Sequence, residues 1–267
     1  MSDLLISGAG GRVGSLLRGP LAGRAILARR GPGAALDWDP LAGPGALREW
    51  CERHGPPAAL LQLARGLPED RARDDAAIGR ATLEAARAAG IGRVLLASSS
   101  AVYGRSRADA WGEDEAVDPP SPYGRSKRAM ELACAGPGVC CLRIGNVAGA
   151  DALLTGTRRP VLLDRFADGA GPARNYIGPG TLARVLLALA RAPALPPLLN
   201  LATPRPVDMA DLARAAGLPV EWQPAPEGAL ARVTLDMRRL ESLVAFADTD
   251  SDPATMVAEW RAAQEPR

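Results

Sequence analysis

The side chains in this sequence best suited to acid–base chemistry are Tyr123 and Lys127, which stand four residues apart. On a helix this spacing places both on one face. A free tyrosine has a pKa of about 10 and is a poor base at neutral pH, but a neighbouring ammonium favours the phenolate. At about 4 Å and an effective dielectric near 20, that cation contributes on the order of 4 kcal/mol before desolvation. The spacing therefore indicates a phenol tuned for proton transfer.

Composition and a nearby serine strengthen this interpretation. The chain has three tyrosines and a single lysine among 32 basic residues, so arginine carries positive charge everywhere else. Ser99 comes 24 residues before Tyr123, at the end of an apolar run. A serine at such a strand end can donate a hydrogen bond to a substrate oxygen while the phenol moves its proton. The alternative is an ordinary helix start with a surface tyrosine and lysine.

A glycine loop follows the first apolar run, Leu4–Ser7, and has the spacing GxxGxxG. Glycines allow a sharp turn and a close approach to a pyrophosphate, which the free amides of the next helix can then bind. A glycine triplet is a weak signal by itself, and its position between a strand and a helix makes it stronger. The predicted cofactor-binding residues of this loop are Gly8, Gly11, Arg12, Val13 and Gly14.

The end of the second predicted strand bears on the choice of dinucleotide. An acidic residue there holds the ribose hydroxyls of NAD, whereas arginine accommodates the 2′-phosphate of NADP. This chain has Arg29 and Arg30 and no acidic residue at that point. Guanidinium groups suit a phosphate dianion, so we expect NADP to be favoured over NAD. The alternative is that both arginines are solvated loop residues.

These residues must be positioned by the apolar runs and helical patterns that alternate through the first two-thirds of the chain. Strands that are apolar throughout and alternate with helices indicate a parallel sheet covered on both faces. The fold class predicted is therefore α/β, a doubly wound (Rossmann) parallel sheet. The expected strands are Leu4–Ser7, Arg24–Ala28, Ala34–Asp37, Ala58–Ala64, Arg93–Ser99 and Val139–Ile144. The expected helices are Arg12–Arg18, Ala46–Arg53, Asp70–Ala89 and Ser121–Ala135.

The pattern loosens after Gly149, which indicates a small C-terminal substrate lobe. We expect residues 1–150 to form the dinucleotide-binding domain and residues 151–267 the lobe, with residues 177–202 returning to the sheet. The expected elements are a polar stretch at 156–174, a helix at 181–191, a strand at 198–202, helices at 207–216 and 254–263, and a proline-rich segment at 219–226.

The bulk composition excludes several classes of protein. A net charge of +2 and the absence of a long basic run argue against a nucleic-acid or membrane partner. No apolar run approaches the roughly 18 residues of a membrane span, and no leader pattern opens the chain, so we expect a cytoplasmic location. The only histidine, His54, stands beside a glycine and two prolines, which argues against a metal centre or a histidine-dependent nucleophile. The predicted partner is a small molecule.

Four segments together resemble the extended short-chain dehydrogenase/reductases, the NAD-dependent epimerase/dehydratase family. They are the glycine loop, Ser98–Gly104, the SPYGRSK box at Ser121–Lys127, and Leu142–Asn146. The resemblance implies catalytic roles for Ser99, Tyr123 and Lys127. It also implies nucleotide-sugar substrates, bound between the carboxyl edge of the sheet and the C-terminal lobe. A homodimer formed through the helices at 70–89 and 121–135 is a further expectation.

The same resemblance implies roles for residues outside the central motifs. At the cofactor it assigns Asp37 and Trp38 near the adenine, together with Leu63, Ala64 and Arg65 after the fourth strand. At the substrate it assigns Ser100, Asn146, Arg174 and Arg232. For Asn146 the alternative is an ordinary turn residue, and for the two arginines a solvated surface charge.

The sequence also departs from the family pattern. Ile177-Gly178-Pro179-Gly180 stands where the family usually has a Val-Asp-Asp helix start, and the serine motif lacks the Asp-Glu pair of the sugar dehydratases. Elimination of water therefore ranks third, after epimerisation and reduction, which the sequence does not separate. The expected function is an NAD(P)-dependent oxidoreductase or epimerase acting on a sugar or nucleotide sugar. Alternatives are an NADPH-dependent reductase of a non-sugar carbonyl and a non-catalytic dinucleotide-binding sensor.

Overall fold

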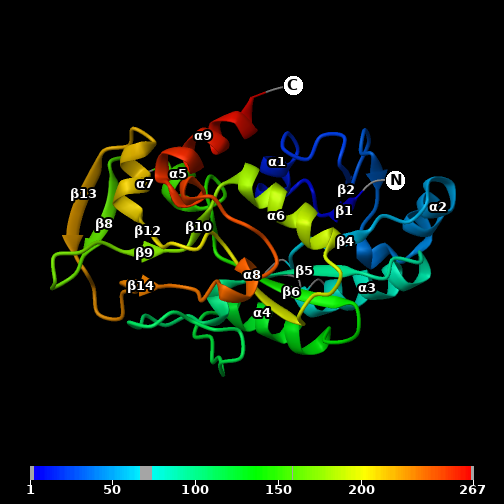
Figure 1. Ribbon diagram of the computed structural model, residues 1–267, viewed down its shortest axis with the longest axis horizontal. Helices are drawn as coiled ribbons and strands as arrows, with labels where there is room; N and C mark the ends of the chain where they lie inside the picture. Colours follow the sequence, from blue (N-terminus) through cyan, green and yellow to red (C-terminus); the bar gives the residue numbers. More distant parts are fainter. Residues whose placement is uncertain (1–2, 67–73, 158, 266–267) are drawn as a thin grey trace.

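A seven-stranded parallel sheet forms the centre of the molecule, whose computed structural model describes residues 3–66, 74–157 and 159–265 (Figure 1). The strand order is β11-β6-β5-β4-β1-β2-β3, and every neighbouring pair is parallel. This confirms the predicted doubly wound sheet. The strands are β1 (Leu4–Ser7), β2 (Ala25–Arg29), β3 (Leu36–Asp37), β4 (Ala59–Gln62), β5 (Val94–Ser99), β6 (Val139–Ile144) and β11 (Leu198–Leu201).

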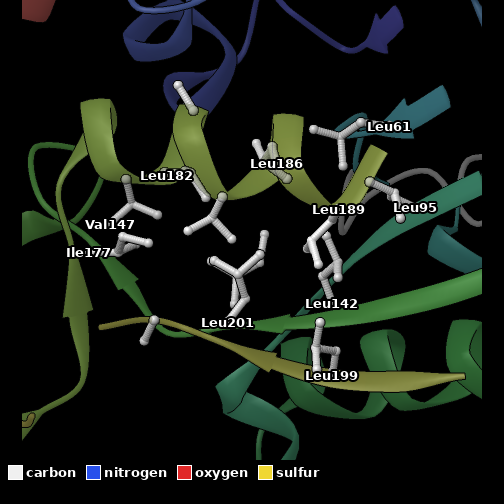
Figure 2. Packing of buried hydrophobic residues seen from close by; sticks show 14 of the residues in the cluster. Leu61, Leu95, Leu142, Val147, Ile177, Leu182, Leu186, Leu189, Leu199 and Leu201 are labelled. Carbon is white, nitrogen blue, oxygen red and sulfur yellow. The ribbon is translucent and has the colours of Figure 1, made fainter. Parts of the chain in front are cut away.

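Helices cover both faces of this sheet because its strands are apolar on both sides. In β1, Leu4 and Ile6 pack with the helices α1 (Arg12–Leu17) and α6 (Pro179–Arg191). Leu5 points the other way, into a second cluster that includes residues of three helices. These are α2 (Gly45–His54), α3 (Asp75–Ala88) and α4 (Pro122–Ala133). Figure 2 shows the first cluster, where the leucines of α6 lie against the leucines of β6 and β11.

The start of α3 differs from the range expected from the sequence. The helix begins at Asp75, and the side chain of Asp74 caps it by accepting a hydrogen bond from the Ala77 amide. The expected start at Asp70 lies outside the described residues. Asp74 is an effective N-cap because its carboxylate satisfies an amide that has no partner inside the helix.

The remaining elements form smaller sheets and a third apolar cluster. The strands are β7 (Asn146–Val147), β8 (Val161–Arg165), β9 (Ala173–Arg174), β10 (Tyr176–Ile177), β12 (Val207–Asp208), β13 (Val220–Pro224) and β14 (Arg232–Val233). The helices are α5 (Ala152–Thr155), α7 (Met209–Ala215), α8 (Arg238–Glu241) and α9 (Pro253–Gln264), with short 3₁₀ turns η1 (Pro40–Ala42), η3 (Ser100–Val102) and η4 (Asp248–Ser251). Residues 177–202 supply α6 and β11 to the main sheet region, and the division of the chain at residue 150 stays a prediction.

None of the short strands of these smaller sheets was expected from the sequence, and the two longest are β8 and β13. β8 lies within the segment predicted as a polar stretch, and β13 within the proline-rich segment, and the two pair in parallel. Val161 and Leu163 of β8 are buried in the third cluster, so the strand follows a short alternation that its polar flanks conceal. β13 has β8 as its strand partner and ends at Pro224. Proline cannot donate a ladder hydrogen bond, so within sheets it is found mainly on edge strands, where no donor is needed.

The first turn of α6 is capped by a residue from the far end of the chain. Gly178 is the N-cap and has no side chain to offer, and Glu259 of α9 replaces it. The Glu259 carboxylate accepts the Thr181 amide at 3.0 Å and the Thr181 hydroxyl at 2.8 Å. A Cβ at Gly178 would lie 2.1 Å from that carboxylate, so a larger residue there would displace the Glu259 side chain from the cap. This arrangement accounts for the missing Val-Asp-Asp helix start.

Replacing Glu259 by alanine is expected to lower the free energy of unfolding by about 1–2 kcal/mol, the cost of losing a helix cap and its charge at the positive end of the helix. Urea denaturation followed by circular dichroism measures this change. Gln264→Ala, on the same helix, is the control and is expected to change stability by less than about 0.5 kcal/mol. Equal stabilities of the two variants would contradict the role of Glu259 as the cap of α6.

Candidate functional site

A cavity of about 800 Å³ opens at the carboxyl ends of the central strands. Its lining comes from the segments that follow β1, β4, β5 and β6 and from α4. In the sheet, β1 lies between β2 and β4, so the chain reverses its direction of progress across the sheet at this point. Ligands of doubly wound sheets bind in the crevice at such a switch point. The volume lies within the roughly 300–1,000 Å³ of small-molecule sites.

The glycine loop after β1 forms one wall of the cavity. Gly8 has φ +73°, and a Cβ there would lie 2.3 Å from the Ala64 nitrogen, so the loops after β1 and β4 touch. A Cβ at Gly14 would lie 2.6 Å from the Ala9 oxygen, which lets α1 begin close to the strand. Gly11 caps α1 without a side-chain hydrogen bond, so the first amides of α1 remain available to an anion. This cradle fits a dinucleotide pyrophosphate.

Ser99, Tyr123 and Lys127 all line this same cavity. The side chain of Ser121 caps α4 by accepting the Gly124 amide at 3.0 Å, and Pro122 occupies the first helical turn. Tyr123 and Lys127 therefore stand one turn apart, with the Lys127 ammonium 5.9 Å from the centre of the phenol ring. The phenol is 44% exposed and the lysine only 3%. The geometry offers an accessible hydroxyl supported by a buried cation.

Gly124 explains how α4 comes so close to the serine segment. A Cβ at this position would lie 2.4 Å from the Ala101 oxygen, so only glycine permits the contact between α4 and η3. Ser99 begins η3 and accepts the Ala101 amide at 3.2 Å. Within the described part of the chain, the Ser99 hydroxyl hydrogen has no acceptor. It is thus available to a ligand oxygen.

A buried network behind the cavity ties α4 to the sheet. Arg143 of β6 makes two hydrogen bonds to the Glu131 carboxylate, at 3.0 and 2.9 Å, and both side chains are almost fully buried. The Ser98 hydroxyl donates to the same carboxylate at 2.6 Å. Burial opposes the ionisation of Glu131, but the bonds from Arg143 and Ser98 outweigh it and lower the pKa of the carboxyl. Glu131 therefore joins the helix of Tyr123 to the strand of Ser99.

Asp75, at the first position of α3, holds the other side of α4. Its carboxylate accepts the Lys127 ammonium at 3.2 Å and the Ser126 hydroxyl at 2.9 Å. It also accepts the Gly66 amide at 3.1 Å, from the segment after β4. These contacts could not be expected from the sequence, because an acidic residue in a first helical turn is usually solvated.

Most of the other predicted site residues also line the cavity. The cofactor-side members are Gly8, Gly11, Arg12, Val13, Gly14, Leu63 and Arg65, and the substrate-side members are Ser100, Asn146 and Arg174. Ala64 lies directly behind Gly8. Arg29, Arg30, Asp37, Trp38 and Arg232 do not belong to the lining.

The residues outside the lining have identifiable local contacts. Arg29 donates to the Pro32 carbonyl at 3.2 Å, and Arg30 lies 3.8 Å from Asp39 while remaining largely exposed. Asp37 accepts the Gly31 amide. These residues surround the turn after β2, beside Gly10, whose Cβ would lie 4.0 Å from that of Arg29.

Trp38 and Arg232 differ from the rest in their surroundings. Trp38 is buried in the second apolar cluster, and its indole nitrogen donates to the Gly43 carbonyl, which fixes the turn leading to α2. Arg232 is exposed; its backbone pairs with Ala173 of β9, and its amide donates to the Ser106 hydroxyl. Their assigned roles at the cofactor and substrate stay predictions.

The substrate end of the cavity contains an arginine bound to carbonyl oxygens. The Arg174 guanidinium donates to the carbonyls of Ala173, Leu230 and Ala231 at 2.6 to 3.0 Å. Burial lowers its pKa, because the charge is removed from water without a carboxylate beside it. Such a cation is suited to an anionic ligand.

Asp151 also lines this end of the cavity and was missed by the sequence analysis. Its carboxyl accepts the Tyr176 hydroxyl at 2.7 Å and the Asn146 amide at 3.4 Å. Burial raises the pKa of Asp151, since these bonds compensate only part of the lost hydration. Its position five residues after Asn146 was the available signal.

Comparisons with known proteins place this geometry in a family. The profile of the NAD dependent epimerase/dehydratase family matches residues 4–187, more than half of the chain. A comparison with curated protein sequences finds no match. The chain therefore belongs to the NAD dependent epimerase/dehydratase family, whose members are NAD-dependent enzymes.

Several solved structures share the fold over nearly their whole length. MoeE5 in complex with UDP-glucose and NAD is 24% identical with a TM-score of 0.72, over 99% of this chain and 100% of that one. UDP-glucose 4-epimerase from Brucella ovis in complex with NAD is 22% identical with a TM-score of 0.76, over 96% of each chain. TunA, an NAD-dependent NDP-hexosamine 5,6-dehydratase, is 19% identical with a TM-score of 0.73, over 98% of each chain. At these identities the likeness shows the fold.

Proposed function

We propose that this protein transfers hydride at a hydroxyl-bearing or carbonyl carbon of a nucleotide sugar, with Ser99, Tyr123 and Lys127 as its reacting site. The observation that carries the proposal is that one cavity is lined both by the glycine cradle and by these three side chains. The MoeE5 and epimerase complexes named above, which contain UDP-glucose or NAD, support a nucleotide-sugar substrate.

Each of the three side chains has a role that follows from its position. In the oxidising direction the substrate hydroxyl gives its proton to the Tyr123 oxygen while its carbon loses hydride. When bound, the nicotinamide cofactor supplies the chemistry of accepting or returning that hydride. The buried Lys127 ammonium favours the phenolate and is placed to hold the cofactor ribose. The Ser99 hydroxyl donates to the substrate oxygen, which stabilises the charge that develops on it.

Two outcomes of this chemistry remain open. In an epimerase the hydride returns to the other face of the carbon and the cofactor is retained. In a reductase the hydride is delivered once and the cofactor exchanges. The test incubates the protein with UDP-glucose and either NAD or NADP. Formation of the C4 epimer without lasting change in nicotinamide absorbance supports an epimerase. Stoichiometric reduction of the cofactor supports an enzyme that exchanges its cofactor, as a reductase does. If the protein binds the dinucleotide but converts neither UDP-glucose nor other UDP-hexoses, the result would favour the alternative of a non-catalytic dinucleotide-binding sensor.

NADP remains the favoured cofactor in this proposal, although the named relatives contain NAD. Arg29 and Arg30 lie at the turn after β2, and guanidinium groups there suit a 2′-phosphate. Quenching of tryptophan fluorescence is expected to show tighter binding of NADPH than of NADH, and Arg30→Ala is expected to weaken only NADPH. NADH binding tighter by about tenfold, or 1.4 kcal/mol, would contradict the NADP assignment.

Two wider expectations belong to this proposal. We infer a homodimer formed through α3 and α4, supported by Leu132 of α4, which is 65% exposed. The cytoplasm is the proposed location. In the described part of the chain, no helix is long and apolar enough to cross a membrane.

A further inference from the structure

Lys127 has an ionic partner that the proposed mechanism does not use. Its ammonium lies 3.2 Å from Oδ1 of Asp75, and both side chains are about 4% exposed. At such burial the attraction between opposite charges is screened far less than at the surface. The pair therefore acts on the nearby Tyr123 phenol as a unit, in which the negative charge of Asp75 offsets part of the positive charge of Lys127.

The Asp75 carboxylate is held in place by three hydrogen bonds from two segments of the chain. The Gly66 amide and the Lys127 ammonium donate to Oδ1, while the Ser126 hydroxyl donates to Oδ2. Gly66 follows the loop of Leu63 and Arg65, which lines the cofactor side of the cavity. The carboxylate thus connects this loop to the helix of Tyr123.

The other charged groups around α4 are engaged elsewhere or lie across the cavity. On α4 itself, Glu131 is bonded to Arg143 and Arg128. On α3, the positive charge of Arg80 lies near the Cys134 thiol, at the far end of α4 from Tyr123, and favours its ionisation. β5 and η3, which also pack against α4, contain only serines and apolar residues and contribute no charge. Four further charged residues line the cavity that Tyr123 also lines: Arg12, Arg65, Asp151 and Arg174.

We propose that Asp75 is a positioning residue: it holds the Lys127 ammonium beneath Tyr123 and moderates its charge, so the Asp75–Lys127 pair sets the pH at which Tyr123 forms phenolate. The inference rests on the proposed role of Tyr123 as the acid–base group. A carboxylate near a phenol opposes its ionisation, whereas an ammonium favours it. Removing the negative charge of Asp75 while keeping its shape must therefore make the phenolate form more readily.

The test is a titration of phenolate absorbance in the cofactor-free protein, which needs neither substrate nor turnover. Tyr103 and Tyr176 are buried, and burial raises the pKa of both. Tyr123→Phe assigns the first transition, because the transition that this variant lacks belongs to Tyr123. If the assay with UDP-glucose shows no conversion, the proposed function is contradicted, but the titration still measures the effect of Asp75 on the Tyr123 phenol.

Asp75→Asn is expected to move the first transition to lower pH by about one unit, a tenfold change in phenolate fraction at fixed pH. Ser126→Ala is the matched control: it removes a hydrogen bond to Asp75 and keeps the charge, so the transition should stay in place. Asp75→Glu should restore the transition toward its original pH. A midpoint that does not move in Asp75→Asn, or that moves upward, overturns the proposal.

A second variant keeps the proposal testable if Asp75→Asn does not fold. Lys127→Met leaves the Asp75 carboxylate without its cation, and the first transition should then move to higher pH by at least one unit. An unchanged midpoint in folded Lys127→Met protein would show that the pair does not control Tyr123. Circular dichroism of each variant confirms the fold before titration.

Discussion

Tyr123→Phe protein is expected to lose about 10²- to 10⁴-fold in turnover and to keep its affinity for the dinucleotide. The phenol oxygen is the group that the proposed mechanism uses to take or give the proton, and positioned acid–base groups contribute this much. The ring itself stays in place at the cavity wall, so cofactor binding loses at most one hydrogen bond. Turnover with UDP-glucose and fluorescence titration with the dinucleotide measure the two quantities separately.

The control for this experiment is Arg125→Lys. Arg125 lies in the same helix, outside the cavity lining, where its guanidinium donates to the Pro120 carbonyl at 2.6 Å. Its turnover should stay within about twofold of the original, a change of under 0.5 kcal/mol in the barrier. Tyr123→Phe protein that turns over as fast as the original would show that the proton moves through another group.

Glu131→Ala is expected to lower the free energy of unfolding by about 3–5 kcal/mol. The substitution leaves the Arg143 guanidinium buried without a counter-charge, and it removes the acceptor of Ser98. An uncompensated buried charge costs far more than the loss of a surface pair. Urea denaturation at neutral pH measures the change. Removing Arg143 as well, in Glu131→Ala/Arg143→Met, should recover much of the stability, because no lone charge then remains.

The effect of Glu131→Ala also depends on pH in a defined direction. The folded protein lowers the pKa of Glu131, so its contribution is fully present above the pKa of the glutamate in the unfolded chain. It is lost as the pH falls through the lower, folded value. The difference in the free energy of unfolding between the original protein and Glu131→Ala should therefore become smaller at acidic pH.

Glu52→Ala is the comparison for this experiment. Glu52 forms an exposed pair with Arg48 at 3.5 Å, and such pairs contribute about 1 kcal/mol or less. If Glu131→Ala were no more destabilising than Glu52→Ala, the buried network would not hold α4 to the sheet.

The central sheet was predictable because its strands are buried on both faces. Runs such as Leu4–Ser7 and Val139–Ile144 are mostly apolar, and the structure gives these two strands with the same bounds. The motif spacing was equally local, since four residues on a helix fix the relation between Tyr123 and Lys127 whatever surrounds them. β8 and β13 escaped prediction because only one side of each is apolar and they lie inside a polar and a proline-rich segment.

The charged contacts that support the site were not predictable. Asp75 meets Lys127 across 52 residues of chain, and Arg143 meets Glu131 from a different element. Asp75, Lys127 and Glu131 lie on helices and Arg143 on a strand, and charged residues of these types usually face water, so nothing local marks them as buried. The cofactor roles of Arg29, Arg30, Asp37 and Trp38 depend likewise on tertiary placement around the turn after β2.

The capping of α6 by Glu259 has a consequence for the order in which the chain is made. Thr181 and Glu259 are 78 residues apart, so when α6 leaves the ribosome the carboxylate that completes its first turn has not been synthesised. Nascent chains generally fold from the N-terminus onward. The helix that covers one face of the nucleotide-binding sheet is therefore finished only when the last helix arrives, and a truncated chain ending before Glu259 would carry an open helix end.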